Sequence, residues 1–267
     1  MRGSDLDLPT KTWDPVCVTG MHGSGGPMVA QLLYRLGLDL GDAPLVAGPA
    51  DPETPWSNTD FVHVNEGILR SLGGDWDVPP PPTPGWERSE EVEPFRQEAG
   101  RLVESFRGRE PWGWEDPRSS LTLSFWLDLL PDMKVVVCVR NPLEAADALR
   151  ERGVTSPAFG LHLWQAYSER LLEALPEGRY VVTHHDAYLY RPQDEIRRIL
   201  DFLGMTASDQ LISLVRSRVV RRSRYRFFEL DELEGFDRTG RLKDLYLQTC
   251  EAAEWNPDPA SSPVLAT

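Results

Sequence analysis

The sequence predicts an α/β fold in which a parallel β-sheet is flanked by helices. Three short apolar runs, "PVCVTG", "KVVVCVR" and "RYVVTH", have the length and composition of buried strands. A helical pattern follows each run, and this alternation is typical of a doubly wound parallel sheet. Ligands of such a sheet bind at the carboxyl ends of the strands, so the residues after each run are the first candidates for a site.

The first run leads through the glycine-rich turn "GMHGSGG" into a helix. The helix is predicted by apolar residues at helical spacing, Val29, Leu32, Leu33 and Leu36. Unpaired N–H groups at a helix start lie at the positive end of its dipole, so this strand, turn and helix predict a phosphate-loop-type cradle. It contains no Lys or Arg between residues 16 and 34, and Pro27 removes one N–H donor. A tight turn that holds no ligand is the alternative.

The segment between the first two strands reads as helices joined by proline-rich connections. Ser57 or Asn58 is expected to cap a helix that carries Phe61, Val64, Ile68 and Leu72. Four consecutive prolines in "GGDWDVPPPPTPGW" predict an extended surface connection. A helix near residues 92 to 106, a turn at "WGWEDPRSS" and a helix at "LTLSFWLDLLP" then lead to the second strand.

The amphipathic helix "DEIRRILDFLG" follows the third strand. Its apolar residues are Ile196, Ile199, Leu200 and Leu203, and Gly204 is expected to end it. We predict one domain over residues 1–254 and a disordered tail over residues 255–267.

Composition limits the possible ligands. A formal net charge of −14 over 267 residues argues against nucleic acid and anionic membranes, so an anionic ligand would need a local basic pocket. Cys17, Cys138 and Cys250 are far apart, which predicts free thiols in a reducing cytoplasm and no metal site. No segment has the apolar length of a signal peptide or of a membrane span, about 18 residues.

The order of the motifs resembles the bacterial sulfotransferases that use 3′-phosphoadenosine 5′-phosphosulfate (PAPS). The resemblance extends over residues 16 to 205 and rests on "GMHGSG", "NTDFVHVNEGILRSLGGDWDVPPP", "WGWEDPRSSLTLSFWLDLLPDMKVVVCVRNPLEAADAL" and "RRILDFLGM". It implies that the glycine-rich loop holds the 5′-phosphosulfate of the donor. It further implies that an Arg after a strand, with a Ser eight residues on, holds the 3′-phosphate. A base then deprotonates the hydroxyl of a small-molecule acceptor.

Residue by residue, the resemblance implies a site for PAPS or its product PAP that departs from the family pattern. The implied positions are His22, Gly23, Ser24, Gly25, Gly26, Arg118, Arg140, Ala148, Arg221 and Arg222. Gly23 stands where the family has Arg or Lys, and Gly26 and Pro27 replace Thr and Ser. Ala148 replaces the Ser of the 3′-phosphate site. For the arginines, surface ion pairing or a solvated basic face is the alternative.

The catalytic positions implied by the resemblance are altered as well. Ser57 replaces the Glu that looks like the family's general base, and serine has no usable pKa for that task near neutral pH. Glu115 replaces a Lys and would repel the donor by about 1 to 4 kcal/mol at a separation of about 4 Å. His22 is the best candidate for a replacement base, with a hydrogen-bonded turn residue as the alternative. For His184 and His185 we favour a structural role.

Two functions follow from this pattern. In the first, the chain keeps the fold but binds PAPS poorly on its own. It is then the partner subunit of an active sulfotransferase relative in natural-product type metabolism. A homodimer is the alternative assembly. In the second, it is an active enzyme that moves a sulfuryl group from PAPS to a hydroxyl of a small metabolite. The altered positions favour the first, because electrostatic stabilisation is usually the largest catalytic contribution.

Overall fold

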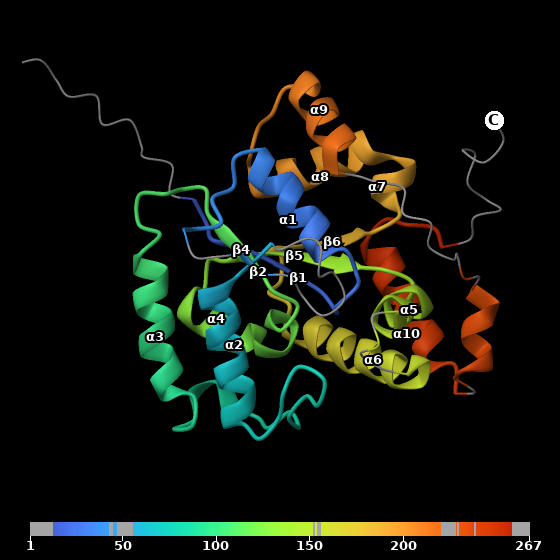
Figure 1. The fold of residues 1–267 in the computed structure, drawn as a ribbon, viewed down its shortest axis with the longest axis horizontal. Helices are drawn as coiled ribbons and strands as arrows, with labels where there is room; N and C mark the ends of the chain where they lie inside the picture. The colour runs from blue at the N-terminus through green and yellow to red at the C-terminus, as the bar shows by residue number, and fades with distance from the viewer. Residues whose placement is uncertain are drawn as a thin grey trace, which may run out of the picture.

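The computed structural model describes residues 13–42, 45–46, 56–151, 153, 156–219, 228, 230–237 and 239–257. Its centre is a parallel sheet with strand order β4-β1-β5-β6. The strands are β1 (Val16–Thr19), β4 (Gly113–Glu115), β5 (Lys134–Val139) and β6 (Tyr180–His184). Helices cover both faces of this sheet (Figure 1), so the predicted fold class is confirmed.

Strand β4 corrects the prediction of a turn at "WGWEDPRSS". Residues 113–115 pair in parallel with residues 16–18. Three residues are too short to show the alternation that marks a strand. Gly113 also permits a close approach, because a Cβ there would lie 2.2 Å from the carbonyl oxygen of Val16.

Alternate residues of the central strands pack on opposite faces. Val16 and Val18 contact one apolar cluster, while Cys17 belongs to another on the opposite face. Figure 1 shows the first face covered from above and the second from below. The first face carries α1 (Gly26–Arg35), α7 (Ala187–Tyr190), α8 (Pro192–Leu203) and α9 (Asp209–Val219). The second carries α2 (Thr59–Ser71), α3 (Glu93–Glu104), α4 (Ser119–Leu129), α5 (Pro142–Glu151), α6 (Pro157–Ala174) and α10 (Arg241–Ala252).

Short elements complete the described chain. The strands β2 (Leu45–Val46) and β3 (Ser57–Asn58) form an antiparallel pair, and η1 (Trp86–Arg88) and η2 (Leu230–Gly235) are short 3₁₀ helices. Of the two proposed caps of α2, Asn58 is the one observed, since its side chain accepts a hydrogen bond from the N–H of Asp60 at 2.9 Å.

Several local predictions are confirmed. Helix α8 ends at Gly204, which has a left-handed φ of 72°. The three cysteines are free and buried. The Trp255 ring stacks on His184 with ring centroids 5.0 Å apart, and the predicted tail over residues 255–267 stays a prediction. Residues 258–267 lie outside the described residues, as do Arg221 and Arg222.

The strand order places a ligand crevice beside β1. The chain passes from β1 to β4 on one side and from β4 to β5 on the other, so the order reverses at β1. Open parallel sheets bind ligands at such a reversal, outside the carboxyl ends of the strands. Among the helices that the structure describes, none combines the length and apolar composition of a membrane span.

Candidate functional site

The glycine-rich loop joins β1 to α1 at the predicted edge of the sheet. Gly20 has a φ of 147°, and a Cβ there would lie 2.1 Å from the carbonyl oxygen of Cys138 on β5. Gly23 and Gly25 also have positive φ, of 85° and 97°. Glycine tolerates these angles without steric cost, so the sequence folds locally into the predicted strand, turn and helix.

Gly23 and Ala148 face each other. A Cβ at Gly23 would lie 3.3 Å from the Cβ of Ala148 and 3.1 Å from the carbonyl oxygen of Ala145 on α5. The resemblance implies a basic side chain at the first position and a hydroxyl at the second. In this chain the loop instead packs directly on α5 and leaves little room there for a larger side chain.

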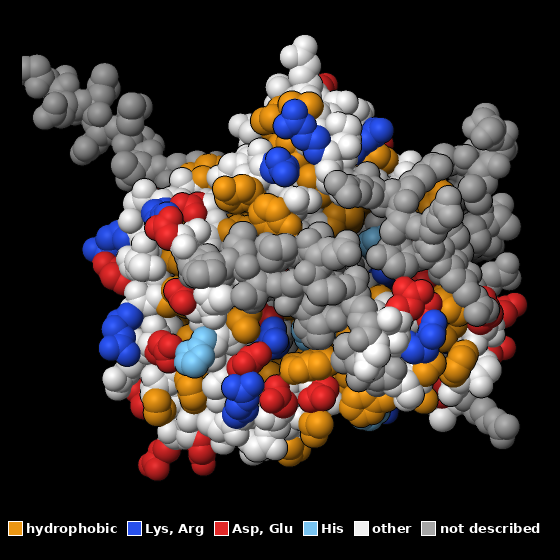
Figure 2. Space-filling view, in the orientation of Figure 1, with side chains coloured by type: hydrophobic (Ala, Val, Ile, Leu, Met, Phe, Trp, Pro, Cys, Tyr) orange, Lys and Arg blue, Asp and Glu red, His pale blue; other side chains and the backbone are white. Residues whose placement is uncertain are grey.

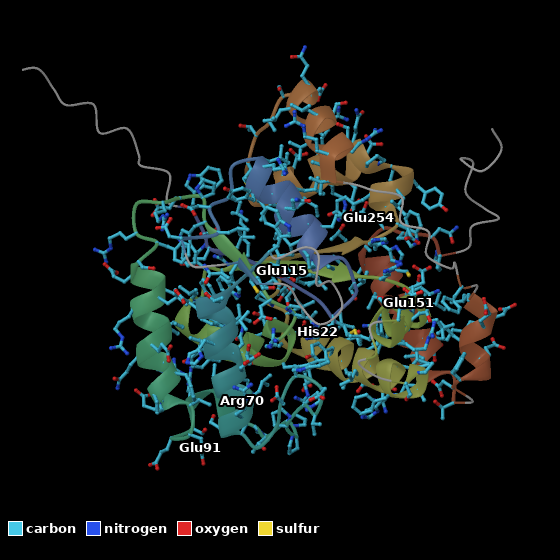
Figure 3. The ribbon with its side chains drawn as sticks, viewed as in Figure 1. His22, Arg70, Glu91, Glu115, Glu151 and Glu254 are labelled. Carbon is cyan, nitrogen blue, oxygen red and sulfur yellow. The ribbon has the colours of Figure 1, made fainter. Side chains whose placement is uncertain are left out.

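Glu115 lies against the first residue of α1. The carboxylate is fully buried at the end of β4, and the Ser57 hydroxyl donates a hydrogen bond to its Oε2 at 2.6 Å. A Cβ at Gly26 would lie 2.5 Å from Oε1. Glu115 therefore places a carboxyl group at the helix N-terminus, the position where the helix dipole favours an anion. Figure 3 shows Glu115 and His22 near the centre of the molecule.

Arg118 is buried and paired with carboxylates of the same chain. Its Nη1 donates to Asp116 Oδ1 and its Nη2 to Glu66 Oε1, both at 2.9 Å. Burial disfavours the charged guanidinium, but the two carboxylates outweigh it and raise the pKa of Arg118. The arginine is thus part of an internal ion pair and not a surface residue.

Arg140 joins the loop to α5. Its Nε donates to Glu144 Oε2 at 2.8 Å, and its Nη1 donates to the carbonyl oxygen of Gly23 at 3.3 Å. Only 4% of Arg140 is exposed. Burial raises the pKa of Glu144 to about 7, although the Arg140 charge opposes this rise. An external phosphate would have to displace Glu144 from the guanidinium.

His22 is enclosed by aromatic rings. Its ring centroid lies 4.8 Å from that of Trp76 and 5.9 Å from that of Tyr167. Within the described chain neither ring nitrogen has a hydrogen-bond partner, and burial holds the pKa of His22 well below its ordinary value. Its role as a base stays a prediction, and this burial argues against it.

Ser24 and Gly25 complete the loop. The Ser24 hydroxyl is buried and has no hydrogen-bond partner among the described residues. Pro27 occupies the second position of α1, so the helix start lacks that N–H. The positions predicted to bind the sulfuryl donor lie around this edge, apart from those outside the described residues.

His185 and Asp186 form a pair beside the loop, and the sequence had favoured a structural role for His185. His185 Nδ1 lies 3.0 Å from Asp186 Oδ1, and a Cβ at Gly25 would lie 2.9 Å from His185 Cδ2. The imidazole therefore lies over the loop. Burial lowers the pKa of His185, while the Asp186 carboxylate raises it to a smaller extent. Both residues directly follow β6, and this position at the carboxyl end of a strand was the feature of the sequence that could have indicated a site.

Comparison with known proteins bears on the family and the fold of the chain. The profile of the sulfotransferase family matches residues 15–209. No curated protein sequence matches the chain. The fold is similar to that of sulfotransferase STF9 from Mycobacterium avium, with 14% identity, a TM-score of 0.57, and coverage of 91% of this chain and 78% of that one. A sulfotransferase from Alicyclobacillus acidocaldarius is 16% identical, with a TM-score of 0.50 and coverage of 92% and 97%.

Proposed function

The chain belongs to the sulfotransferase family, and we propose that it binds the donor PAPS only weakly on its own and acts as the partner subunit of an active sulfotransferase relative. Its setting would be the metabolism of small molecules of natural-product type. The weak donor binding is argued from the sheet edge that carries the glycine-rich loop, and the partner role from the surface over α1 and α9.

The side chains at this edge do not fit a donor with about four negative charges. The loop offers no cation, and Arg118 and Arg140 are each held by carboxylates of the chain. A charge-assisted hydrogen bond contributes about 1.5 to 3 kcal/mol, so a site without several of them is strongly weakened.

Glu115 carries the proposal. Its carboxylate is buried beside the first residue of α1 and is held there by the Ser57 hydroxyl. A phosphosulfate at this helix start would meet a negative charge at short range, where repulsion in a partly buried site reaches about 4 kcal/mol. Ser57 is at the same time the residue that replaces the expected base.

The surface over α1 and α9 supports a partner role. Tyr34 on α1 and Leu211 and Leu214 on α9 are exposed by 38 to 50%. Figure 2 shows apolar side chains gathered over these two helices. Apolar side chains that gather on a surface are typical of protein contact sites.

Calorimetric titration of the isolated chain with PAP tests the first part. We expect a Kd above about 100 μM, and submicromolar binding would overturn the proposal.

Co-expression with a relative that retains Arg or Lys in its loop tests the second part, the partner role. Leu214→Asp should abolish co-purification, whereas Leu247→Asp, on the exposed side of α10, should leave it unchanged. A monomeric chain under these conditions would contradict the partner role.

The second candidate function is an active PAPS-dependent sulfotransferase that acts on a hydroxyl of a small metabolite. One observation favours it, namely the His185 imidazole over the loop with Asp186 at its Nδ1. Its lowered pKa keeps the ring neutral at pH 7 and able to accept a proton. Donor-dependent turnover by the isolated chain, lost in His185→Gln and kept in His162→Gln on the exposed face of α6, would establish this function.

A further inference from the structure

A second candidate site lies away from the loop. A cavity of about 450 Å³ is formed by α2, α4, α6 and the proline-rich segment 80–87. In Figure 1 this segment belongs to the loop below α2 and α6. No residue between 20 and 27 lines the cavity. Its volume falls within the range of small-molecule sites, about 300 to 1,000 Å³.

Leucines and prolines form two apolar sides of the cavity, and these sides are held in place. Leu69, Leu121 and Leu123 are buried along it, and prolines 80, 81, 82 and 84 form the opposite side. Proline fixes its own φ, which limits the motion of this segment. Two side chains of α6 also hold it, since the Tyr167 hydroxyl donates to the carbonyl oxygen of Trp76 at 2.8 Å and Arg170 donates to that of Pro80. A preformed cavity lowers the entropic cost of binding.

The polar groups of the cavity are incompletely satisfied by the protein. No carboxylate of the described chain lies within ion-pair distance of Arg170, although the side chain is half-buried and burial lowers its pKa. The Ser124 hydroxyl, which also lines the cavity, makes no hydrogen bond to another described residue. The Glu173 carboxylate raises the pKa of Arg170 in part but forms no ion pair with it, so the partly desolvated guanidinium can still pair with an anionic partner. Its planar fork matches the geometry of a carboxylate.

We propose that this cavity binds a small amphipathic carboxylic acid. The carboxylate pairs with Arg170 and with the Ser124 hydroxyl, and the apolar body of the molecule lies between the leucines of α2 and α4 and the proline segment. Glu87 and Glu173 also line the cavity. Glu173 is exposed and Glu87 is partly exposed, so water screens their repulsion of an anion. The proposal uses none of the residues of the loop and does not depend on sulfuryl transfer.

Calorimetric titration with 4-phenylbutanoate and its neutral amide, 4-phenylbutanamide, tests the role of Arg170. We expect the intact chain to bind the acid at least tenfold more tightly than the amide. Arg170→Met should remove this preference, and Arg170→Lys should retain part of it. Arg101→Met, at an exposed site of α3 outside the cavity, is the matched control and should change nothing. Equal binding of acid and amide to the intact chain, or no effect of Arg170→Met, would overturn the proposal.

A second variant tests the location. Ser124→Phe places a ring in the cavity and should abolish binding of the acid while circular dichroism shows a folded chain. Binding that persists in folded Ser124→Phe would contradict the proposal, as would absence of any binding to the intact chain at about 1 mM acid. PAP should not displace the acid, because its expected site is the loop. If each molecule of PAP that binds displaces one molecule of the acid, the acid binds at the loop and the proposal is wrong.

Discussion

At the carboxyl edge of the sheet, Arg118 and Arg140 each lie against carboxylates of their own chain, whereas Arg170 in the cavity has the backbone carbonyl of Pro80 as its partner. The first two are the arginines that family resemblance assigns to the donor. A buried charge must be compensated, and at the edge the protein itself does so. An arginine therefore indicates a ligand site only where its charge is not already paired, and by this criterion the cavity is the better anion site.

Asp116→Ala is expected to have the largest effect on the difference between the sheet edge and the cavity. The substitution leaves the buried Arg118 with only one of its two carboxylates and removes one acceptor of the Asn65 amide, whose Nδ2 lies 2.7 Å from Asp116 Oδ2. We expect the free energy of unfolding to fall by about 3 to 5 kcal/mol, measured by urea denaturation. Arg170→Met is the counterpart in the cavity and should cost less than about 1 kcal/mol, because it breaks no ion pair.

Millimolar PAP added to Asp116→Ala should recover part of the lost stability, since the released guanidinium can bind an anion. A loss below about 1 kcal/mol in Asp116→Ala would show that the edge pairs contribute little. The contrast between the two regions would then have no energetic basis.

The sequence predicted the fold well because its signals are local. Strands β1, β5 and β6 are each marked by an apolar run, and helix α8 is marked by the helical spacing of its apolar residues. Strand β4, with three residues, carries no such signal.

The state of the site could not be predicted in the same way. The family resemblance pointed to Arg118 but not to its pairing with Glu66, 52 residues away. The contact of Glu115 with Gly26 and the cavity under the prolines likewise depend on segments that are distant in the chain. No local pattern encodes such contacts.

His22→Phe tests the packing between the two regions, because the His22 ring touches Trp76 next to the proline segment. Burial lowers the pKa of His22 from an ordinary value of 6.5, so below that pH the unfolded chain binds one proton more than the folded chain. Stability is therefore lost as the pH falls, by about 1.4 kcal/mol per pH unit for this group. The variant should reduce the loss between pH 6.5 and 5 by about 2 kcal/mol.

Tyr167→Phe is the matched control for this measurement. It removes a hydroxyl beside the same ring but leaves the imidazole in place, so the pH dependence of unfolding should be retained. An unchanged pH slope in His22→Phe would show that the ring is accessible to protons in the folded state, and the catalytic hypothesis for His22 would regain support.

Glu115→Gln tests whether the Glu115 carboxylate weakens anion binding at the loop. Glutamine keeps the size of the side chain and an acceptor for the Ser57 hydroxyl but removes the charge beside Gly26. Affinity for PAP should rise about tenfold, or about 1.4 kcal/mol, by calorimetry. Glu110→Gln, at an exposed site, should have no effect. An unchanged affinity would assign the weak site to the packing of Gly23 and to Pro27 instead.

Glu173→Gln is expected to have the smallest effect and tests the sign of the charge in the cavity. The carboxylate lines the cavity and is exposed, so its repulsion of a bound anion is weak. Affinity for 4-phenylbutanoate should rise about twofold, and affinity for the amide should not change. Glu177→Gln, just beyond α6 and outside the cavity, is the control. Weaker binding of the acid in Glu173→Gln would mean that Glu173 acts on the ligand through Arg170, whose charge it stabilises, and that direct repulsion of the anion is not the main effect.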